Sequence, residues 1–313
     1  MELYVPVGHG WWDDATWRFG EVFGDDRLAQ QYLVIHDGVY EERDGYYATY
    51  DREFPEREIK CVTPEQFHAL GKWRFVMPSV QENQHGYHRL AQRCGATSLY
   101  QVGNRGQRID WSLEPLVLCS AEQRLDGRGV RYHQEFDKDG MFAYRPPEPG
   151  AETSAASFVN CFTLMPSQWA TFKAVEAEMP DWRWGVYGEQ GRDGKLCPTS
   201  LVRDAMAQYG WAWHDKPQGD GFGHVIHYWA AVGRPLIGHA AHYAGLYAGP
   251  LWEDGITAVT LDGRTHGDVA ALLRAYASDP GRHAQMCLRI RDRLEELVDY
   301  DREEVAIRAL LGL

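Results

Sequence analysis

A glycine-rich turn between two apolar runs carries the residues of this sequence that are best suited to chemistry. The polar triplet 214–216 (His-Asp-Lys) follows an apolar run, and residues 219–223 read Gly-Asp-Gly-Phe-Gly. Glycine lets the main chain approach an anion closely, and free N–H groups at a helix start can hold phosphate. Asp220 can accept hydrogen bonds from sugar hydroxyls. The segment therefore predicts a site for a phosphorylated sugar.

The flanking sequence predicts that this turn joins a strand to a helix. Residues 211–213 are expected to form a strand, and residues 225–232 have helical spacing that ends at Gly233. A second strand is expected from residue 235. Two plainer interpretations stay open: the glycines serve only tight packing, and Asp220 is only the N-cap of the helix.

The segment 220–237 resembles the donor-binding motif of GT-B glycosyltransferases, in particular of their retaining members. That motif has an acidic residue, Gly-Phe-Gly, a second glutamate and then Ala-x-Gly-x-Pro. This segment begins Asp-Gly-Phe-Gly and reads Ala-Val-Gly-Arg-Pro at 231–235. The resemblance implies that Asp220 binds donor-sugar hydroxyls and that the amides of residues 221–223 face the diphosphate. The second glutamate, which binds the ribose in the family, is Tyr228 here.

Residues next to the motif are expected to complete the donor site. Lys216 precedes the turn and is expected to neutralise charge on the diphosphate leaving group. His224 is expected to contact the donor, and His227 to replace part of the missing ribose contact. The predicted donor-binding residues are His214, Lys216, Gly219, Gly221, Phe222, Gly223, His224, His227 and Tyr228. Asp220 is assigned a catalytic role.

Two histidine pairs have the spacing of neighbours on a helical face. His224 and His227 are three residues apart, and His239 and His242 repeat that spacing. Such pairs can bind a metal ion, but no cysteine or carboxylate set with recognisable ligand spacing accompanies them. The sequence therefore predicts no metal site.

The start of the chain carries the residues expected on the acceptor side. An apolar run at 3–7 predicts a strand that leads directly into Gly8-His9-Gly10. Imidazole titrates near neutrality, so His9 is expected to act as a general base or as a transition-state contact, unless it is merely polar surface. The other predicted acceptor-side residues are Gly8, Gly10, Asp13 and His85.

Alternating strands and helices run through both halves of the chain and predict an α/β protein with largely parallel sheets. A composition shift over 126–154, which includes a proline-rich run, predicts a boundary near residue 150. The expected domains are residues 1–150, on the acceptor side, and residues 151–313, which bind the nucleotide sugar. The resemblance implies two facing Rossmann-like domains (GT-B) with a cleft between them and a helical C-terminal tail.

Composition limits the classes of function. The chain has 313 residues, of which 44% are hydrophobic and 25% charged, as in soluble globular proteins. A net charge of −13 argues against a general nucleic-acid coat, although a local basic cleft remains open. The six cysteines have no paired spacing, the chain begins without a recognisable signal peptide and no membrane span is expected. A cytoplasmic protein is predicted.

The resemblance predicts a glycosyltransferase, of hexosyltransferase type, that moves a sugar from a nucleotide diphosphate to an acceptor hydroxyl. The co-substrate expected is a UDP-sugar, with no tightly bound cofactor. The acceptor is a hydroxymethylated DNA base, a glycan or a small molecule, since compact enzymes of this fold include phage enzymes that glycosylate DNA bases. Two alternatives stay open: a nucleotide-sugar epimerase of the same fold, and a non-catalytic nucleotide-sugar-binding protein.

Overall fold

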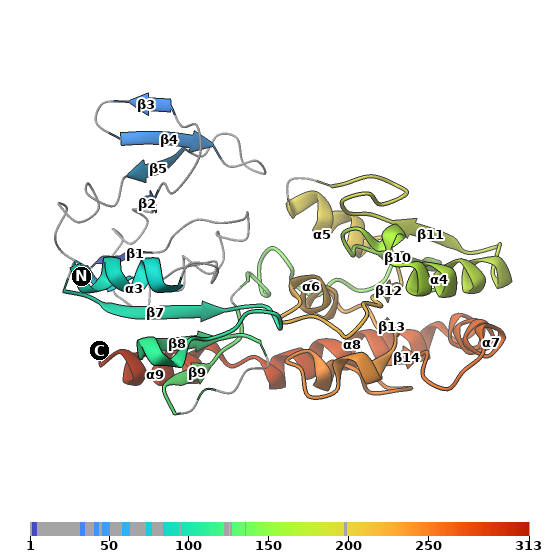
Figure 1. Cartoon of the computed structure of the whole chain (residues 1–313). Helices are drawn as coiled ribbons and strands as arrows, with labels where there is room; N and C mark the ends of the chain where they lie inside the picture. Colours follow the sequence, from blue (N-terminus) through green and yellow to red (C-terminus); the bar gives the residue numbers. More distant parts are fainter. Residues whose placement is uncertain are drawn as a thin grey trace. The chain divides into compact units, whose positions relative to one another are not determined.

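The computed structural model describes residues 84–312 except 94, 122–124, 126, 135 and 197–198, and before residue 84 the backbone of six short strands. The chain forms two compact units (Figure 1). The first comprises residues 1–136 and 300–313, and the second comprises residues 137–299.

Five parallel strands form one sheet of the first unit, in the order β1-β6-β7-β8-β9. Buried side chains of β7 and β8, among them Tyr100 and Val117, form its core. The elements are β1 (Glu2–Tyr4), β6 (Trp73–Val76), α3 (Gln84–Arg93), β7 (Thr97–Val102), β8 (Leu116–Cys119), β9 (Gly129–Arg131) and α9 (Tyr300–Leu311).

A second, mixed sheet of the first unit has the order β2-β5-β4-β3. Its strands are β2 (Tyr32–Val34), β3 (Glu41–Arg43), β4 (Tyr46–Tyr50) and β5 (Glu58–Val62). β3 and β4 form an antiparallel hairpin that the sequence analysis did not predict. The reason is that β3 reads Glu-Glu-Arg and lacks the apolar alternation by which a strand is recognised.

The second unit is a doubly wound α/β fold. Its parallel sheet has the order β11-β10-β12-β13-β14, so the strands stand in the order 2-1-3-4-5 by their sequence in the unit. The strands are β10 (Ser154–Ser157), β11 (Arg183–Val186), β12 (Trp211–Trp213), β13 (Leu236–Gly238) and β14 (Ala258–Thr260). The helices are α4 (Pro166–Glu178), α5 (Thr199–Ala207), α6 (His224–Val232), α7 (His266–Ala277) and α8 (Pro280–Leu297).

Aromatic side chains fill the core of this second sheet. Trp211 and Trp213 on β12 are fully buried. The ring of Phe172 on α4 meets Trp213 edge to face, with centroids 5.2 Å apart. A parallel sheet covered by helices on both faces buries both sides of its strands, which explains why β12 reads Trp-Ala-Trp without alternation. Much of the tryptophan content is therefore core packing and not ligand-binding surface.

Local sequence explains where α6 begins and ends and where α7 begins. α6 lies between Gly223 and Gly233, both in the left-handed region with φ of 82° and 80°. Glycine adopts this conformation without the steric cost that a Cβ atom imposes. α7 begins with a capping box, in which Thr265 and Asp268 satisfy each other's backbone N–H groups.

The extended chain of β10 ends early within an apolar stretch. β10 ends at Ser157, and residues 162–164 form a 3-10 helix. Cys161 has a left-handed φ of 56°, and this turn separates the strand from the 3-10 helix. No helix among the described residues has the length and apolar character needed to cross a membrane.

The compact units do not coincide with a boundary near residue 150. The chain leaves the first unit at residues 136–137 and returns to it at 299–300. The last helix, α9, belongs to the first unit because its buried Glu303 accepts a hydrogen bond from the backbone N–H of His133 at 2.8 Å. The helical tail is therefore shared: α7 and α8 belong to the second unit and α9 to the first.

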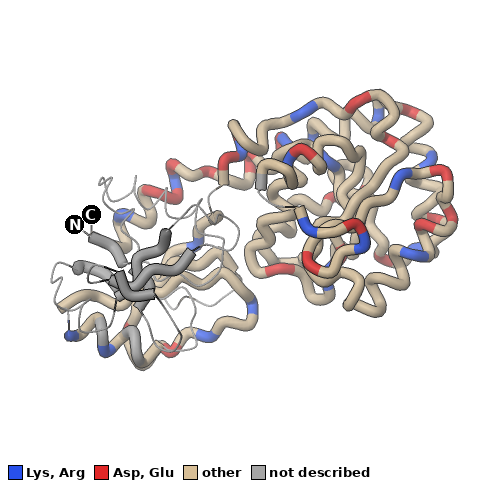
Figure 2. The backbone as a smooth tube through the Cα atoms, turned by 90° about the horizontal axis from the view of Figure 1, so that it is seen from above, with Lys and Arg blue, Asp and Glu red and all other residues tan. Residues whose placement is uncertain are grey.

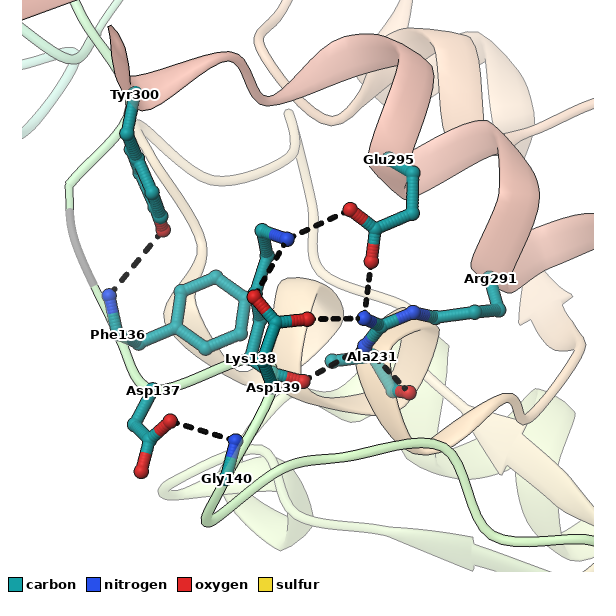
Figure 3. Close-up of polar contacts among 9 residues, drawn as sticks. All are labelled: Phe136, Asp137, Lys138, Asp139, Gly140, Ala231, Arg291, Glu295 and Tyr300. Carbon is teal, nitrogen blue, oxygen red and sulfur yellow. Dashed lines mark hydrogen bonds and ion pairs between the residues drawn. The ribbon is translucent and has the colours of Figure 1, made fainter.

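Polar contacts fix the chain at these two crossings (Figure 3). In the first unit, the backbone N–H of Phe136 donates to the Tyr300 hydroxyl at 3.3 Å. In the second unit, Lys138 pairs with Glu295 at 2.6 Å, and Arg291 donates to Asp139 at 2.6 Å. The segment that enters the second unit is thus tied to α8, the helix by which the chain leaves it.

Candidate functional site

The carboxyl ends of β12 and β13 position the predicted donor residues. The two strands are parallel neighbours, with Trp213 opposite Ile237. His214 follows directly after β12, and the chain then passes through the glycine turn into α6. The order of the sheet reverses between β10 and β12, and ligands of doubly wound folds bind beyond the strand ends at such a switch point. The predicted residues therefore follow a strand end that borders the usual ligand site of this fold.

Asp220 lies between an imidazole and an ammonium group. Its Oδ2 atom accepts a hydrogen bond from His214 Nε2 at 2.7 Å, and its Oδ1 atom contacts Lys216 Nζ. The side chains of His214 and Asp220 are only 2% and 9% exposed, whereas that of Lys216 is 33% exposed. Burial alone would raise the pKa of the Asp220 carboxyl, but the bond and charge of His214, with Lys216, hold this pKa well below its usual range. The carboxylate is therefore ionised at neutral pH.

Asp220 is not the cap of the following helix. The N-cap of α6 is Gly223, and no side chain caps this helix. Both carboxylate oxygens of Asp220 are engaged by His214 and Lys216 instead. The structure thus removes the plainer interpretation of Asp220 as an N-cap.

The turn needs glycine at its first position. Gly219 has a left-handed φ of 72°, and a Cβ atom there would lie 2.4 Å from the carbonyl oxygen of His242. His242 belongs to a 3-10 helix, Ala240–Tyr243, that follows β13. The turn and this short helix therefore approach each other backbone to backbone, a contact that any side chain at 219 would prevent.

The predicted donor residues of α6 are largely buried. His227 is fully buried, its Nδ1 donates to the carbonyl of Gly223 at 2.9 Å, and its ring stacks on Phe222 with centroids 4.1 Å apart. The Tyr228 hydroxyl and His224 Nδ1 share a hydrogen bond at 3.3 Å. Burial lowers the pKa of the His224 imidazole to about 4, against the opposing charge of Asp220. His224 is therefore neutral at pH 7, and His227 holds the glycine turn in place.

The acceptor-side predictions fall mostly beyond what the structure describes. Gly8, His9, Gly10 and Asp13 lie outside the described residues. His85 lies on α3 of the first unit, where its exposed imidazole Nε2 is 3.1 Å from a carboxylate oxygen of Asp110. Its acceptor role stays a prediction.

Sequence reasoning missed the structural role of Arg234. This residue is fully buried, and its guanidinium donates to five backbone carbonyls that come from several separate segments. Those carbonyls belong to Arg145, Ala207, Tyr209, Val232 and Gly233. The sequence does hold one signal of this role: the arginine stands directly after the glycine that ends an apolar helix. Arg234 ties the end of α6 to the loop that enters β12.

Sequence reasoning also missed Asp215. Its carboxylate is fully buried, and its Oδ1 atom lies 3.0 Å from His239 Nδ1 and 3.3 Å from His242 Nδ1. The acidic residue stands directly after an apolar strand, which was the signal in the sequence. Its partners are more than twenty residues away along the chain, and only the pairing of β12 with β13 brings them together.

Comparison with solved structures finds chains with this fold over nearly their whole length. HepE from Anabaena in complex with UDP-glucose matches with a TM-score of 0.67 at 11% identity, over 100% of this chain and 99% of that chain. Sucrose-phosphate synthase from Thermosynechococcus elongatus matches with a TM-score of 0.63 at 12% identity, over 99% and 98%. An α-glucosyltransferase in complex with UDP and a 13-mer DNA containing an HMU base matches with a TM-score of 0.65 at 9% identity, over 100% of both chains. No family model matches this sequence, and no curated protein matches it either.

These similarities establish the fold of the chain. They establish nothing beyond the fold, because the sequence identity is too low. The α/β class with parallel sheets and a helical C-terminal segment agrees with the resemblance on which the sequence analysis relied. The cleft between facing domains stays a prediction. The chain has the GT-B fold.

Proposed function

We propose that this chain is a glycosyltransferase that transfers a sugar from a UDP-sugar to an acceptor hydroxyl. The observation that carries the proposal is the ionised, largely buried Asp220 in a glycine turn beside the switch point of a GT-B fold. A buried carboxylate of this kind can accept two hydroxyl hydrogen bonds and orient a sugar ring. The solved relatives with bound UDP or UDP-glucose support the choice of donor.

The donor-side residues divide into contacts with the sugar and contacts with the diphosphate. The amides of Gly221, Phe222 and Gly223 precede the N-terminus of α6 and would face the diphosphate, where helix N–H groups favour negative charge. Lys216, the more exposed partner of Asp220, would exchange part of that contact for a phosphate oxygen. Asp220 would then be free to meet the sugar hydroxyls, with His214 still bonded to it.

The reaction needs one bond to form and one to break at the anomeric carbon. The acceptor oxygen bonds to this carbon as the bond from the carbon to the diphosphate oxygen breaks, and the diphosphate leaves with the electron pair. The acceptor hydroxyl gives up its proton to a base, for which we propose His9. Gly8, Gly10, Asp13 and His85 are proposed to border the acceptor.

A hydroxymethylated DNA base is the acceptor we would test first. One solved relative holds a DNA with an HMU base. Figure 2 shows acidic and basic residues interspersed along the described backbone. Because contacts with phosphates release counterions, a duplex affinity that falls as the salt concentration rises would support a DNA acceptor.

We also propose a cytoplasmic location. The sequence supports this location, because its six cysteines have no paired spacing, as is usual for reduced thiols.

Product analysis by mass spectrometry tests the function. The protein is incubated with UDP-glucose or UDP-N-acetylglucosamine, with and without duplex DNA that contains hydroxymethylated bases, and the products are identified. Transfer requires that a glycosylated acceptor and free UDP appear together. An isomerised nucleotide sugar in the absence of acceptor would establish the epimerase instead. Binding of donor without transfer, hydrolysis or isomerisation would establish a non-catalytic binding protein.

A further inference from the structure

Three potential metal ligands meet beside the glycine turn. Asp215 follows β12, and His239 and His242 follow β13, in and next to the 3-10 helix Ala240–Tyr243. One ligand atom from each of these three side chains lies within 4.8 Å of the others. The cluster combines two imidazoles with one carboxylate, a donor set that suits divalent transition metals.

The separations of Asp215 from the two histidines fit ligands that share one ion. Metal–nitrogen and metal–oxygen bonds in such sites are about 2.0–2.2 Å long, so two ligands of one ion lie roughly 3.0–3.4 Å apart. The Asp215 Oδ1 atom is 3.0 Å from His239 Nδ1 and 3.3 Å from His242 Nδ1. Little movement of the side chains would be needed to coordinate an ion.

The carboxylate of Asp215 supplies an independent sign of a missing partner. It is fully buried, and within the described part of the chain its Oδ2 atom has no hydrogen-bond donor. A buried carboxylate oxygen without a partner is unfavourable, and proteins normally pair such a charge or use it to coordinate a metal. The two histidines remain 29% and 28% exposed, so an ion and water can reach the cluster from solvent.

We propose that Asp215, His239 and His242 bind a divalent transition-metal ion. Three protein ligands leave coordination positions for water or for an oxygen of a bound ligand, as in sites that are not purely structural. The site borders the glycine turn, since the His242 carbonyl is the atom that a side chain at Gly219 would strike. Magnesium prefers six oxygen ligands and is expected to bind this imidazole-rich set poorly. The inference rests on this cluster alone and does not depend on the identity of the donor.

Zinc binding by the full chain, without any nucleotide, tests the inference. The protein is stripped with a chelator, and Zn²⁺ is titrated by isothermal calorimetry, with the bound metal counted after dialysis. His239→Asn, His242→Asn and the double variant remove ligands that are partly exposed and so are expected to fold. His266→Asn, which changes an exposed histidine at the start of α7, is the matched control.

Wild type and His266→Asn are expected to bind one Zn²⁺ per chain. Each single variant is expected to weaken binding at least about tenfold, and the double variant to abolish it. Mg²⁺ at the same concentration is expected to produce no saturable heat. Absence of stoichiometric zinc in the wild type, or wild-type affinity in the double variant, would overturn the proposal and leave a hydrogen-bonded cluster. Because no nucleotide is present, this failure is distinct from any failure to bind UDP.

Discussion

Asp220 offers a way to separate a catalytic carboxylate from a structural one. Asp220→Asn keeps an oxygen that can accept the hydrogen bond of His214 but removes the charge beside Lys216. We expect UDP affinity to change little, while the rate of sugar transfer falls about 10²-fold, equivalent to about 2.7 kcal/mol. Steady-state kinetics of sugar transfer to the acceptor that product analysis identifies, or of donor hydrolysis, measures the effect. The exposed Asp292→Asn in the same unit is the control. Transfer at the wild-type rate would mean that the carboxylate is no part of the site.

Lys216 is expected to act on the phosphates. Lys216→Ala should weaken UDP binding clearly more than uridine binding, because a lysine ammonium attracts the charge of the diphosphate and not the base or ribose. Lys173→Ala, on the outer surface of α4, is the control and should alter neither. Calorimetric titration with UDP and with uridine gives, for each ligand, the ratio of the variant's Kd to the wild-type Kd. Equal losses for UDP and uridine would show that Lys216 only supports Asp220.

His224 should make stability depend on pH. Its pKa is lowered to about 4 in the folded protein, below the ordinary value near 6.5, because burial disfavours the charged form. The unfolded chain therefore binds more protons between these two values. This contribution to stability is present above about pH 6.5 and is lost as the pH falls toward 4. His224→Asn should flatten the fall in unfolding free energy between pH 7 and 5, measured with urea, while the exposed His266→Asn should not. Parallel pH profiles for wild type and His224→Asn would contradict the assignment.

At the scale of elements, the glycine turn can be tested by a pair of substitutions. Gly219 and Gly263 both have left-handed φ, of 72° and 70°, but a Cβ atom would meet the His242 carbonyl at the first and nothing within 4 Å at the second. Gly263→Ala should therefore lower the free energy of unfolding only by the strain of the left-handed conformation, about 1–2 kcal/mol. Gly219→Ala should cost about 1–3 kcal/mol more, and should also weaken UDP binding, because the turn must move. Urea unfolding measures the loss of stability, and calorimetry measures the affinity for UDP. Equal costs and unchanged affinity would show that the close approach is unimportant.

The elements around the motif were predictable because their sequence signals are local. Apolar residues at 211–213, the helix that ends at Gly233 and the strand that follows it were all expected, and all are present. The hairpin of β3 and β4 was not, because a charged triplet forms one of its strands. The cluster of Asp215 with His239 was not either, since parallel pairing joins residues that are far apart in sequence.

At the scale of the whole molecule, the sequence predicted the fold class but not the division of the chain. Alternation of strands and helices is enough to predict an α/β protein with parallel sheets. The return of α9 to the first unit depends on contacts such as that of Glu303 with His133, which no local pattern reveals. A proline-rich run near residue 150 resembles a linker, but the segment is held in the second unit, where the Arg145 carbonyl accepts from Arg234.

Stabilisation of the whole chain by UDP tests the central claim most directly. A ligand that binds only the folded state stabilises it by mass action, by about 2.7 kcal/mol when free UDP is 100 times its Kd. Urea unfolding with increasing UDP should show this dependence on concentration in the wild type, with uridine much less effective. We expect saturable binding of UDP, and the measured Kd should account for the stabilisation at each UDP concentration. No change in unfolding free energy with UDP, with any other nucleoside diphosphate or with a nucleotide sugar would contradict it.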